Sequence, residues 1–211
     1  MFAYLWKLTG GGSAGQLRDS AGGRECAMSA EVVSFASMNR DTASRLVRAG
    51  LVTGVVDAIF SSVLVTVFYH STVTRLWQGV ASVPLGKEAL NGGTTMALIG
   101  LLIHFGVAFW WSAVFLLLYM RSARIRDLVA SRYGMVKVAV LYGPFIWLVM
   151  SLAVIPLLAH RPPTINFRWW VQLLGHIPFV AIPIVASVSK GSGRRENPAT
   201  HSGGYAQAQV T

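Results

Sequence analysis

The stretch TTMALIGLLIHFGVAFWWSAVFLLLYM, residues 94–120, decides the fold class of this chain. Its 27 residues include no Asp, Glu, Lys or Arg. An α-helix needs about 20 apolar residues to cross a hydrocarbon layer roughly 30 Å thick. The stretch is therefore predicted to be a membrane-spanning helix.

His104 lies near the middle of this span, where an ionisable side chain costs free energy unless it faces protein or a water-filled cavity. The residues one and two helical turns away are small, namely Ala97, Gly100, Ala108 and Ser112. They share a helix face with the histidine, and small residues let a second helix approach closely. We therefore expect His104 to face another helix.

The composition and three further apolar stretches extend this prediction to the whole chain. Of the 211 residues, 54% are hydrophobic and 12% are charged, whereas a soluble domain has about 25% charged residues. We predict an all-α, polytopic membrane protein whose residues 45–190 form one bundle of four transmembrane helices. The predicted spans are residues 49–69, 94–120, 136–158 and 168–189.

The two ends of the chain are polar and rich in glycine. Residues 1–44 are predicted to be a disordered tail, or to include residues that precede a true translation start at Met28 or Met38. Residues 191–211 are predicted to be a second disordered tail. The single cysteine, Cys26, excludes an internal disulfide and a thiolate cluster for metal.

The positive charges predict the orientation. The formal net charge is +10, but the basic residues lie mainly at the ends of apolar stretches, which indicates membrane topology and anionic lipid rather than nucleic acid. One side of the membrane would carry Lys7, Arg18, Arg24, Arg40, Arg45, Arg48, Arg121, Arg124, Arg126, Arg132, Lys137, Lys190, Arg194 and Arg195. The other would carry Arg75, Lys87, Arg161 and Arg168. We therefore expect both termini in the cytoplasm.

Two segments on the outer side have features of their own. Val73, Leu76, Trp77 and Val80 follow helical spacing, with Arg75 and Gln78 opposite, which predicts a short interfacial helix with Trp77 at headgroup level. The segment with His160, Arg161 and Arg168 has the charge to contact an anionic lipid headgroup, but a topological or interfacial role is favoured.

Polar residues in three spans form the candidate site. Asp57 is the only acidic residue in a predicted span, and Ser61 lies one turn after it. His176 follows Gln172 by one turn in the fourth span. With the predicted topology, Asp57, His104 and His176 come to similar depth near the midplane. They could form a proton or solute site, or simply hydrogen-bond between helices.

Three classes of function remain open. The first is a protein that handles protons or a small solute through these residues. The second is a non-catalytic membrane subunit, which would act as a homo-oligomer or with a membrane partner. The third uses His104 and His176 as ligands of haem b or a metal. The chain has no phosphate-binding glycine loop, zinc-protease motif or nucleophile–base spacing, so we expect no enzyme activity and no required cofactor.

Several motifs occur together in residues 45–190, namely Gly54-x-x-Asp57, residues 77–86, Gly92-Gly93, Gly100 to His104, and the proline-containing span around His176. Together they resemble small four-helix bacterial inner-membrane proteins of the YagU type, whose activity is unassigned. The resemblance covers residues 45–190 and implies a bacterial plasma membrane. The chain departs from it at Ser151, where an amide residue is usual.

A short internal similarity suggests a duplicated pair of helices. Residues 101–104 read LLIH, and residues 173–176 read LLGH. This match indicates a possible two-plus-two repeat of the four spans.

Overall fold

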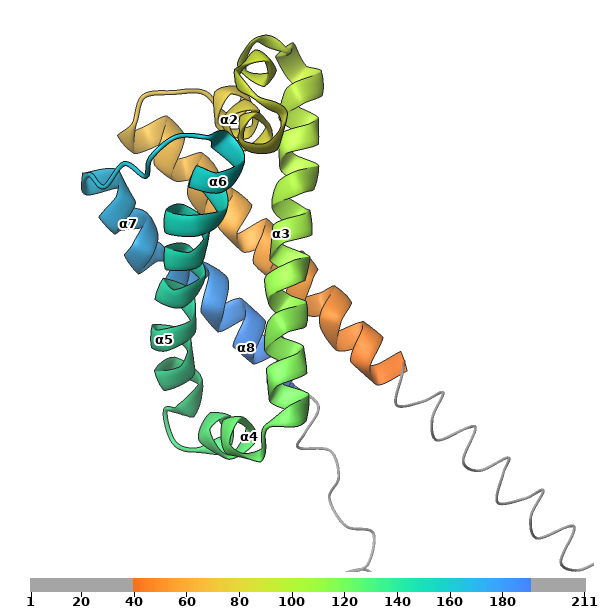
Figure 1. The fold of residues 1–211 in the computed structure, drawn as a ribbon. Helices are drawn as coiled ribbons and strands as arrows, with labels where there is room; N and C mark the ends of the chain where they lie inside the picture. Colours follow the sequence, from red (N-terminus) through yellow and green to blue (C-terminus); the bar gives the residue numbers. More distant parts are fainter. Residues whose placement is uncertain (1–39, 191–211) are drawn as a thin grey trace, which may run out of the picture. The chain divides into compact units, whose positions relative to one another are not determined.

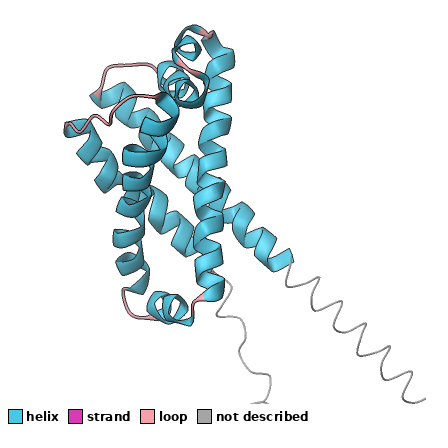
Figure 2. Cartoon of the chain, viewed as in Figure 1, coloured by secondary structure: helices cyan, strands magenta, loops and turns pink. Residues whose placement is uncertain are grey.

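The computed structural model describes residues 40–190, in which all regular structure is helical (Figure 2). Four helices are long and apolar enough to span a membrane: Arg40–Phe68, Gly93–Arg121, Gly134–Ala159 and Phe167–Ser189. The prediction of an all-α chain with four spans is confirmed. Residues 40–44 are helical, which differs from the predicted tail. The other tail predictions, including those for Cys26, Met28 and Met38, lie outside the described residues.

The four spans differ in regularity. The second span is one uninterrupted helix, α3 (Gly93–Arg121), and it contains no proline. The other elements are the π-turn η1 (Leu64–Phe68) that ends the first span, α2 (Val73–Leu85), η2 (Lys87–Asn91), α4 (Ala123–Ala130), α5 (Gly134–Val149), η3 (Met150–Val154), α6 (Ile155–Ala159), α7 (Phe167–His176), η4 (Ile177–Ala181) and α8 (Ile182–Ser189).

The helices of residues 45–190 pack side by side (Figure 1). Helix α5 runs along the fourth span and contacts α7, η4 and α8 in turn. Helix α3 contacts α8, and α4 contacts the ends of α3, α5 and α8. At the other end, α2 lies between α3 and α6. The short helices α2 and α4 therefore close opposite ends of the packed spans.

Glycines of the first span let it approach α3. A Cβ on Gly50 would lie 2.5 Å from the Phe109 ring, and a Cβ on Gly54 would lie 2.5 Å from the Phe105 ring. The residue numbers rise along one helix while they fall along the other, so the two helices are antiparallel. Thr53 on the same stripe is only 1% exposed. Gly50, Thr53 and Gly54 therefore lie on the face of the first span that packs against protein.

Helix α2 is present as predicted, but its orientation is not the predicted one. Trp77 is 6% exposed rather than placed at a headgroup surface, and Gln78 is buried rather than opposite it. The Gln78 amide donates a hydrogen bond to the Gly93 carbonyl over 3.0 Å. Gly100 of α3 packs directly against the backbone carbonyl of Trp77. Close contact with α3 therefore buries the helix face that periodicity alone assigned to the interface.

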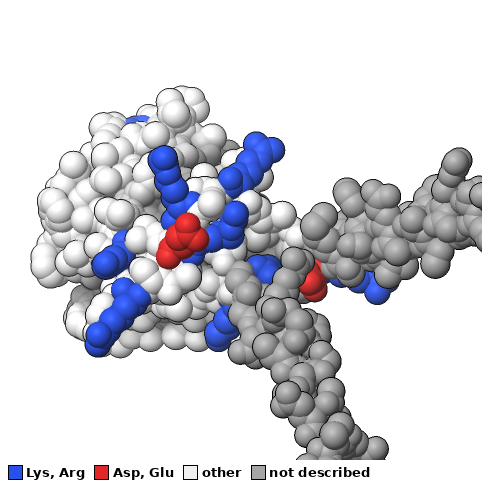
Figure 3. Space-filling model, turned by 90° about the horizontal axis from the view of Figure 1, so that it is seen from below, with Lys and Arg blue, Asp and Glu red and all other residues white. Residues whose placement is uncertain are grey.

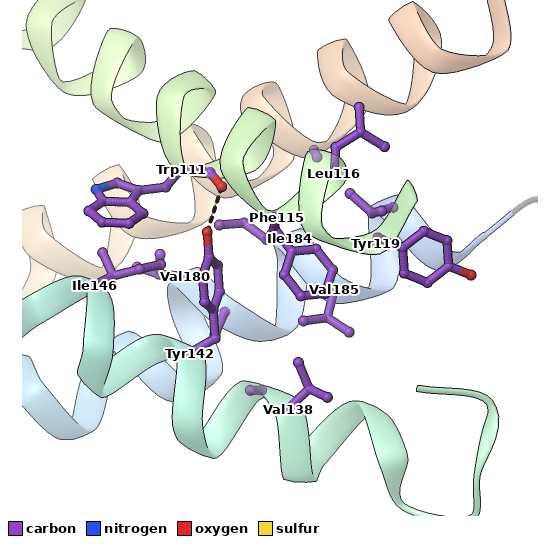
Figure 4. Packing of buried hydrophobic residues seen from close by; sticks show 14 residues of the cluster. Trp111, Phe115, Leu116, Tyr119, Val138, Tyr142, Ile146, Val180, Ile184 and Val185 are labelled. Atoms are coloured by element: carbon purple, nitrogen blue, oxygen red, sulfur yellow. Dashed lines mark hydrogen bonds between the residues drawn. The ribbon is translucent and has the colours of Figure 1, made fainter. Parts of the chain in front are cut away.

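An apolar core fills the half of the molecule nearest α4 (Figure 4). It is formed by α3, α5 and the fourth span, with Phe115, Ile184 and Val185 almost completely buried. The Tyr142 hydroxyl donates to the Trp111 carbonyl over 2.7 Å inside this core. This half contains no ionisable carboxyl or histidine among its core residues.

The third and fourth spans each contain a π-turn just before a proline. In η3 the Ile155 N–H donates to the Met150 carbonyl, one residue before Pro156. In η4 the Ile182 N–H donates to the Ile177 carbonyl, one residue before Pro183. Proline lacks a donor and its ring clashes with the preceding turn, so the widened turn accommodates it.

Basic residues gather at the α4 end, and Lys and Arg outnumber acidic residues on the face shown in Figure 3. Several also hold helix ends. Arg48 donates to the Ser187 and Lys190 carbonyls, and Arg126 donates to the Tyr119 and Met120 carbonyls. The last carbonyls of a helix have no partner within it, so the arginines satisfy them. Arg48 and Arg126 therefore have a structural role at the helix ends.

Candidate functional site

Asp57 and His104 meet between the first span and α3. The Asp57 Oδ2 atom lies 3.9 Å from the His104 Nδ1 atom. The side chains are 15% and 13% exposed, respectively. The pair lies one turn beyond the Gly54–Phe105 contact, so the same antiparallel register that packs the glycines brings these two polar groups together. The structure thus brings together two residues that the sequence placed only at a similar depth.

A backbone hydrogen bond orients the His104 ring. Its Nε2 atom lies 3.1 Å from the Gly54 carbonyl oxygen. A carbonyl only accepts hydrogen bonds, so Nε2 must carry the proton of this bond. In a neutral imidazole, Nδ1 is then an acceptor that faces the Asp57 carboxyl. Two acceptors that face each other repel, so a proton bound to either group would make this contact favourable.

His176 ends helix α7 and is fixed in a similar way. Its Nδ1 atom lies 2.7 Å from the Gln172 carbonyl oxygen, so Nδ1 carries the proton of that bond. The other ring nitrogen, Nε2, is left as an acceptor in the neutral ring. His176 is 9% exposed, and its backbone carbonyl packs against Gly143 of α5. The side chain is thus held between two spans.

The three ionisable groups form one electrostatic cluster. Asp57 interacts with the charges of both His176 and His104, and the two histidines interact with each other. Asp57 and His104 are in contact, and His176 lies near enough for its charge to act on Asp57. A carboxylate buried without a nearby positive charge is unfavourable, and a protonated imidazole is the group that can neutralise it here.

Two buried oxygen atoms beside this cluster have no hydrogen-bond partner among the described residues. They are Asp57 Oδ1 and Thr53 Oγ1, one helical turn apart on the first span. An unpaired polar atom in an apolar region costs about 1–3 kcal/mol. Such an arrangement is unfavourable for stability alone, and it is the kind of feature that marks a functional site.

A tryptophan covers each histidine. The Trp77 and His104 ring centroids are 5.0 Å apart, and those of Trp147 and His176 are 4.8 Å apart. A cation within about 6 Å of an aromatic centroid is attracted to the ring, and a protonated imidazole is such a cation. The sequence analysis missed both tryptophans as site residues. Trp147 lies one turn from Gly143 on the small-residue stripe of its span, and that pattern could have identified it.

The side chains of the remaining predicted residues do not contact Asp57 or the two histidines through hydrogen bonds. Gln172 joins the site through its backbone carbonyl. Ser61 is half-buried one turn after Asp57 and forms no hydrogen bond with Asp57 or the histidines. Ser151, the position that departs from the YagU pattern, accepts a hydrogen bond from the Trp169 indole N–H over 3.1 Å. The structure therefore places Ser61 beside the cluster rather than in it.

The geometry does not fit the haem or metal alternative. His104 directs Nε2 at the Gly54 carbonyl and Nδ1 at Asp57, so neither nitrogen can bind a metal while these contacts remain. An axial haem ligand must present one ring nitrogen to iron. Among residues 40–190, no group of three or more His, Cys, Asp or Glu side chains is arranged to hold a metal ion.

Comparisons with known proteins add no function to this geometry. No protein-family model matches the chain, and neither a curated protein nor a solved structure matches it. The function is therefore argued from the site itself.

Proposed function

We propose that this protein holds and transfers protons within the membrane, alone or together with a small solute, through Asp57, His104 and His176. The observation that carries the proposal is the orientation of His104. The His104 Nε2–H donates a hydrogen bond to the Gly54 carbonyl. The Nδ1 atom and the Asp57 carboxyl therefore face each other, and either of them can accept a proton.

The same geometry supports a short transfer path. Asp57 interacts with both histidines, so a proton that it releases has an acceptor on either side. The His176 Nδ1–H donates to Gln172, which leaves Nε2 as the accepting atom. The faces of Trp77 and Trp147 stabilise each imidazolium in turn. Residues His176, Asp57 and His104 would therefore act as successive proton-binding positions, and no residue is assigned a catalytic role.

The proposal includes the membrane arrangement that the sequence suggests. The spans would form one four-helix bundle in a bacterial plasma membrane, with both termini in the cytoplasm. The described Lys and Arg residues support the orientation. The α4 end has Arg45, Arg48, Arg121, Arg124, Arg126, Arg132, Lys137 and Lys190, and the α2 end has Arg75, Lys87, Arg161 and Arg168. A YagU-like relationship and a two-plus-two repeat remain hypotheses within this proposal.

Proton entry into liposomes tests the proposal directly. Protein is reconstituted with an internal pH-sensitive dye, and a potassium diffusion potential drives proton entry. We expect Asp57→Asn to reduce the proton flux to that of protein-free liposomes, because an amide side chain does not bind and release protons at the pH of the assay. Asp127→Asn is the matched control, since it removes an exposed acid on α4 and should leave the flux unchanged.

Infrared difference spectra between two pH values provide a second readout that needs no transported solute. We expect a carboxyl C=O band that changes with pH, disappears in Asp57→Asn and persists in Asp127→Asn. A band without flux would indicate that proton movement requires a co-transported solute. If neither the band nor the flux depended on Asp57, the proposal would be wrong.

A non-catalytic membrane subunit is the second candidate, and one observation favours it. The first span is the least buried of the four, because only 17% of its most apolar 18-residue segment is buried inside the protein. Its outer face exposes apolar side chains such as Ile59 and Val67. Lipid, a second copy or a partner subunit could cover this face. Purification as a defined oligomer, or only together with another subunit, would support this candidate.

A further inference from the structure

A cleft of about 310 Å³ opens beside the fourth span at the α2 end of the molecule. Its floor includes the buried side chains of Ser151 and Trp169, which are each 8% exposed. Its mouth is formed by the exposed segment between α6 and α7, with Arg161 and Arg168. Small-molecule sites in proteins begin at about this volume. The cleft is therefore large enough for one small ligand or one lipid headgroup.

The cleft combines positive charge with apolar surface. Neither arginine has a carboxylate partner within the described residues, where the only ion pair recorded is that of Asp57 and His104. The Arg168 guanidinium lies 4.0 Å from the centroid of the Tyr69 ring, which holds it near the mouth. The N-terminus of α7 also borders the cleft through Asn166, and a helix N-terminus favours negative charge. Three independent features thus favour an anion.

The apolar walls add a second requirement for the ligand. Trp147, Trp169, Ile155 and Pro156 line the cleft. An inorganic anion would use only the charged mouth. An anionic group on an apolar body would use both parts of the cleft.

We propose that this cleft binds an anionic oxygen group, a carboxylate or a phosphate, carried on an apolar body. The arginines at the mouth bind the anion, and the tryptophans bind the apolar part. Trp147 and Gln172 belong both to the cleft and to the immediate surroundings of His176, so the occupied cleft would border the proton site. The anion site itself does not depend on proton transfer by Asp57.

Two sources supply this chemistry, and one experiment with two arms separates them. In the first arm, tryptophan fluorescence of the detergent-purified protein is titrated with sodium butanoate and sodium phosphate, with butan-1-ol and potassium chloride as controls. In the second arm, the protein is placed in phosphatidylcholine nanodiscs that contain a minor fraction of phosphatidylglycerol. Native mass spectrometry then identifies the lipids that stay bound to the protein. Saturable binding of butanoate identifies a small organic anion. Retention of phosphatidylglycerol alone identifies a lipid headgroup.

Three variants decide whether the cleft is responsible. Arg161→Gln is the first, because Arg161 is exposed and its side chain forms no hydrogen bond or ion pair within residues 40–190. The double variant Arg161→Gln, Arg168→Gln follows. We expect binding at least tenfold weaker in the first variant and absent in the second. Lys87→Gln removes an exposed positive charge that does not line the cleft, and it should bind like the unmodified protein.

The outcomes separate this proposal from the proton site. Asp57→Asn should retain anion binding even where it loses proton flux. The anion proposal is overturned if neither probe binds in either arm, or if Lys87→Gln weakens binding as much as Arg161→Gln. Near-ultraviolet circular dichroism of each variant confirms that the tryptophan surroundings, and thus the cleft, remain folded.

Discussion

The two halves of the packed spans are built on different principles. The half next to α4 contains Phe115, Tyr142 and Ile184 in a continuous apolar core, with no carboxyl or histidine among the core residues. The half next to α2 contains Asp57 and two histidines. Buried polar atoms without a hydrogen-bond partner occur in both halves, such as Trp111 Nε1 in the first and Asp57 Oδ1 in the second. The halves therefore differ in their ionisable groups.

This difference suggests that one half stabilises the fold and the other carries the ionisable groups. Inside a bilayer, helix association depends on van der Waals packing and hydrogen bonds, because lipid tails are as apolar as side chains. The α4 half supplies this packing. The α2 half can then tolerate unfavourable polar groups whose protonation can change. Substitutions in the first half should therefore affect stability, and substitutions in the second should affect proton handling.

The largest stability effect is expected for Phe115→Ala. Phe115 is 2% exposed in the middle of the apolar core, so truncation leaves a cavity. We expect a loss of about 3 kcal/mol in the free energy of unfolding, at the low end for such a change because the lipid-exposed reference state is also apolar. Unfolding in mixed detergent micelles measures it.

Leu117→Ala is the matched control for this change. Leu117 lies on the same helix, is 54% exposed, and should change stability little. The proton flux of Phe115→Ala, measured per amount of folded protein, should equal that of the unmodified protein. Loss of flux at unchanged folded fraction would show that the two halves are not independent.

An intermediate effect is expected for Gly143→Ala. The new Cβ would lie 2.7 Å from the His176 carbonyl oxygen, which is closer than atoms of this kind normally approach. We expect a loss of about 2 kcal/mol in stability together with reduced proton flux, because the turn that carries His176 must shift. Gly106→Ala is the control, since a Cβ there has no neighbour within 4 Å. Reduced stability with normal flux would separate His176 from the proton path.

The smallest effect is expected for Tyr142→Phe. The change removes the hydrogen bond to the Trp111 carbonyl but keeps the ring in the core. Hydrogen bonds between membrane helices contribute about 0.6 kcal/mol on average, so we expect a loss of this order in stability and no change in flux. The same micelle unfolding measures it, with Tyr133→Phe at an exposed tyrosine as the control. A change of flux in Tyr142→Phe would extend the functional region into the apolar half.

The four spans were predictable because their signal is length and hydrophobicity. The predicted second span, residues 94–120, differs from Gly93–Arg121 by one residue at each end. The orientation of α2 was not predictable in the same way. Its period predicted a helix, but only the contact of Gly100 with the Trp77 backbone shows which face is buried. Periodicity identifies a helix more reliably than it identifies the neighbour.

The site was predictable in part for a related reason. Depth placed Asp57, His104 and His176 at a similar level, since depth follows from counting residues along each span. The hydrogen bonds that orient the imidazoles were not predictable, because they use the backbone carbonyls of Gly54 and Gln172. Backbone acceptors leave no signature in the sequence.

The π-turn η4 also sets the phase of the fourth span. Eight residues separate His176 from Ile184, which in a regular α-helix places their side chains about 80° apart around the axis. One extra residue in a π-turn brings them back to within about 20°, so both are buried on one side of the span. The π-turn η4 therefore acts as a single-residue insertion that aligns the buried faces of α7 and α8. A deletion within η4 would leave each segment helical but rotate His176 relative to the buried face of α8.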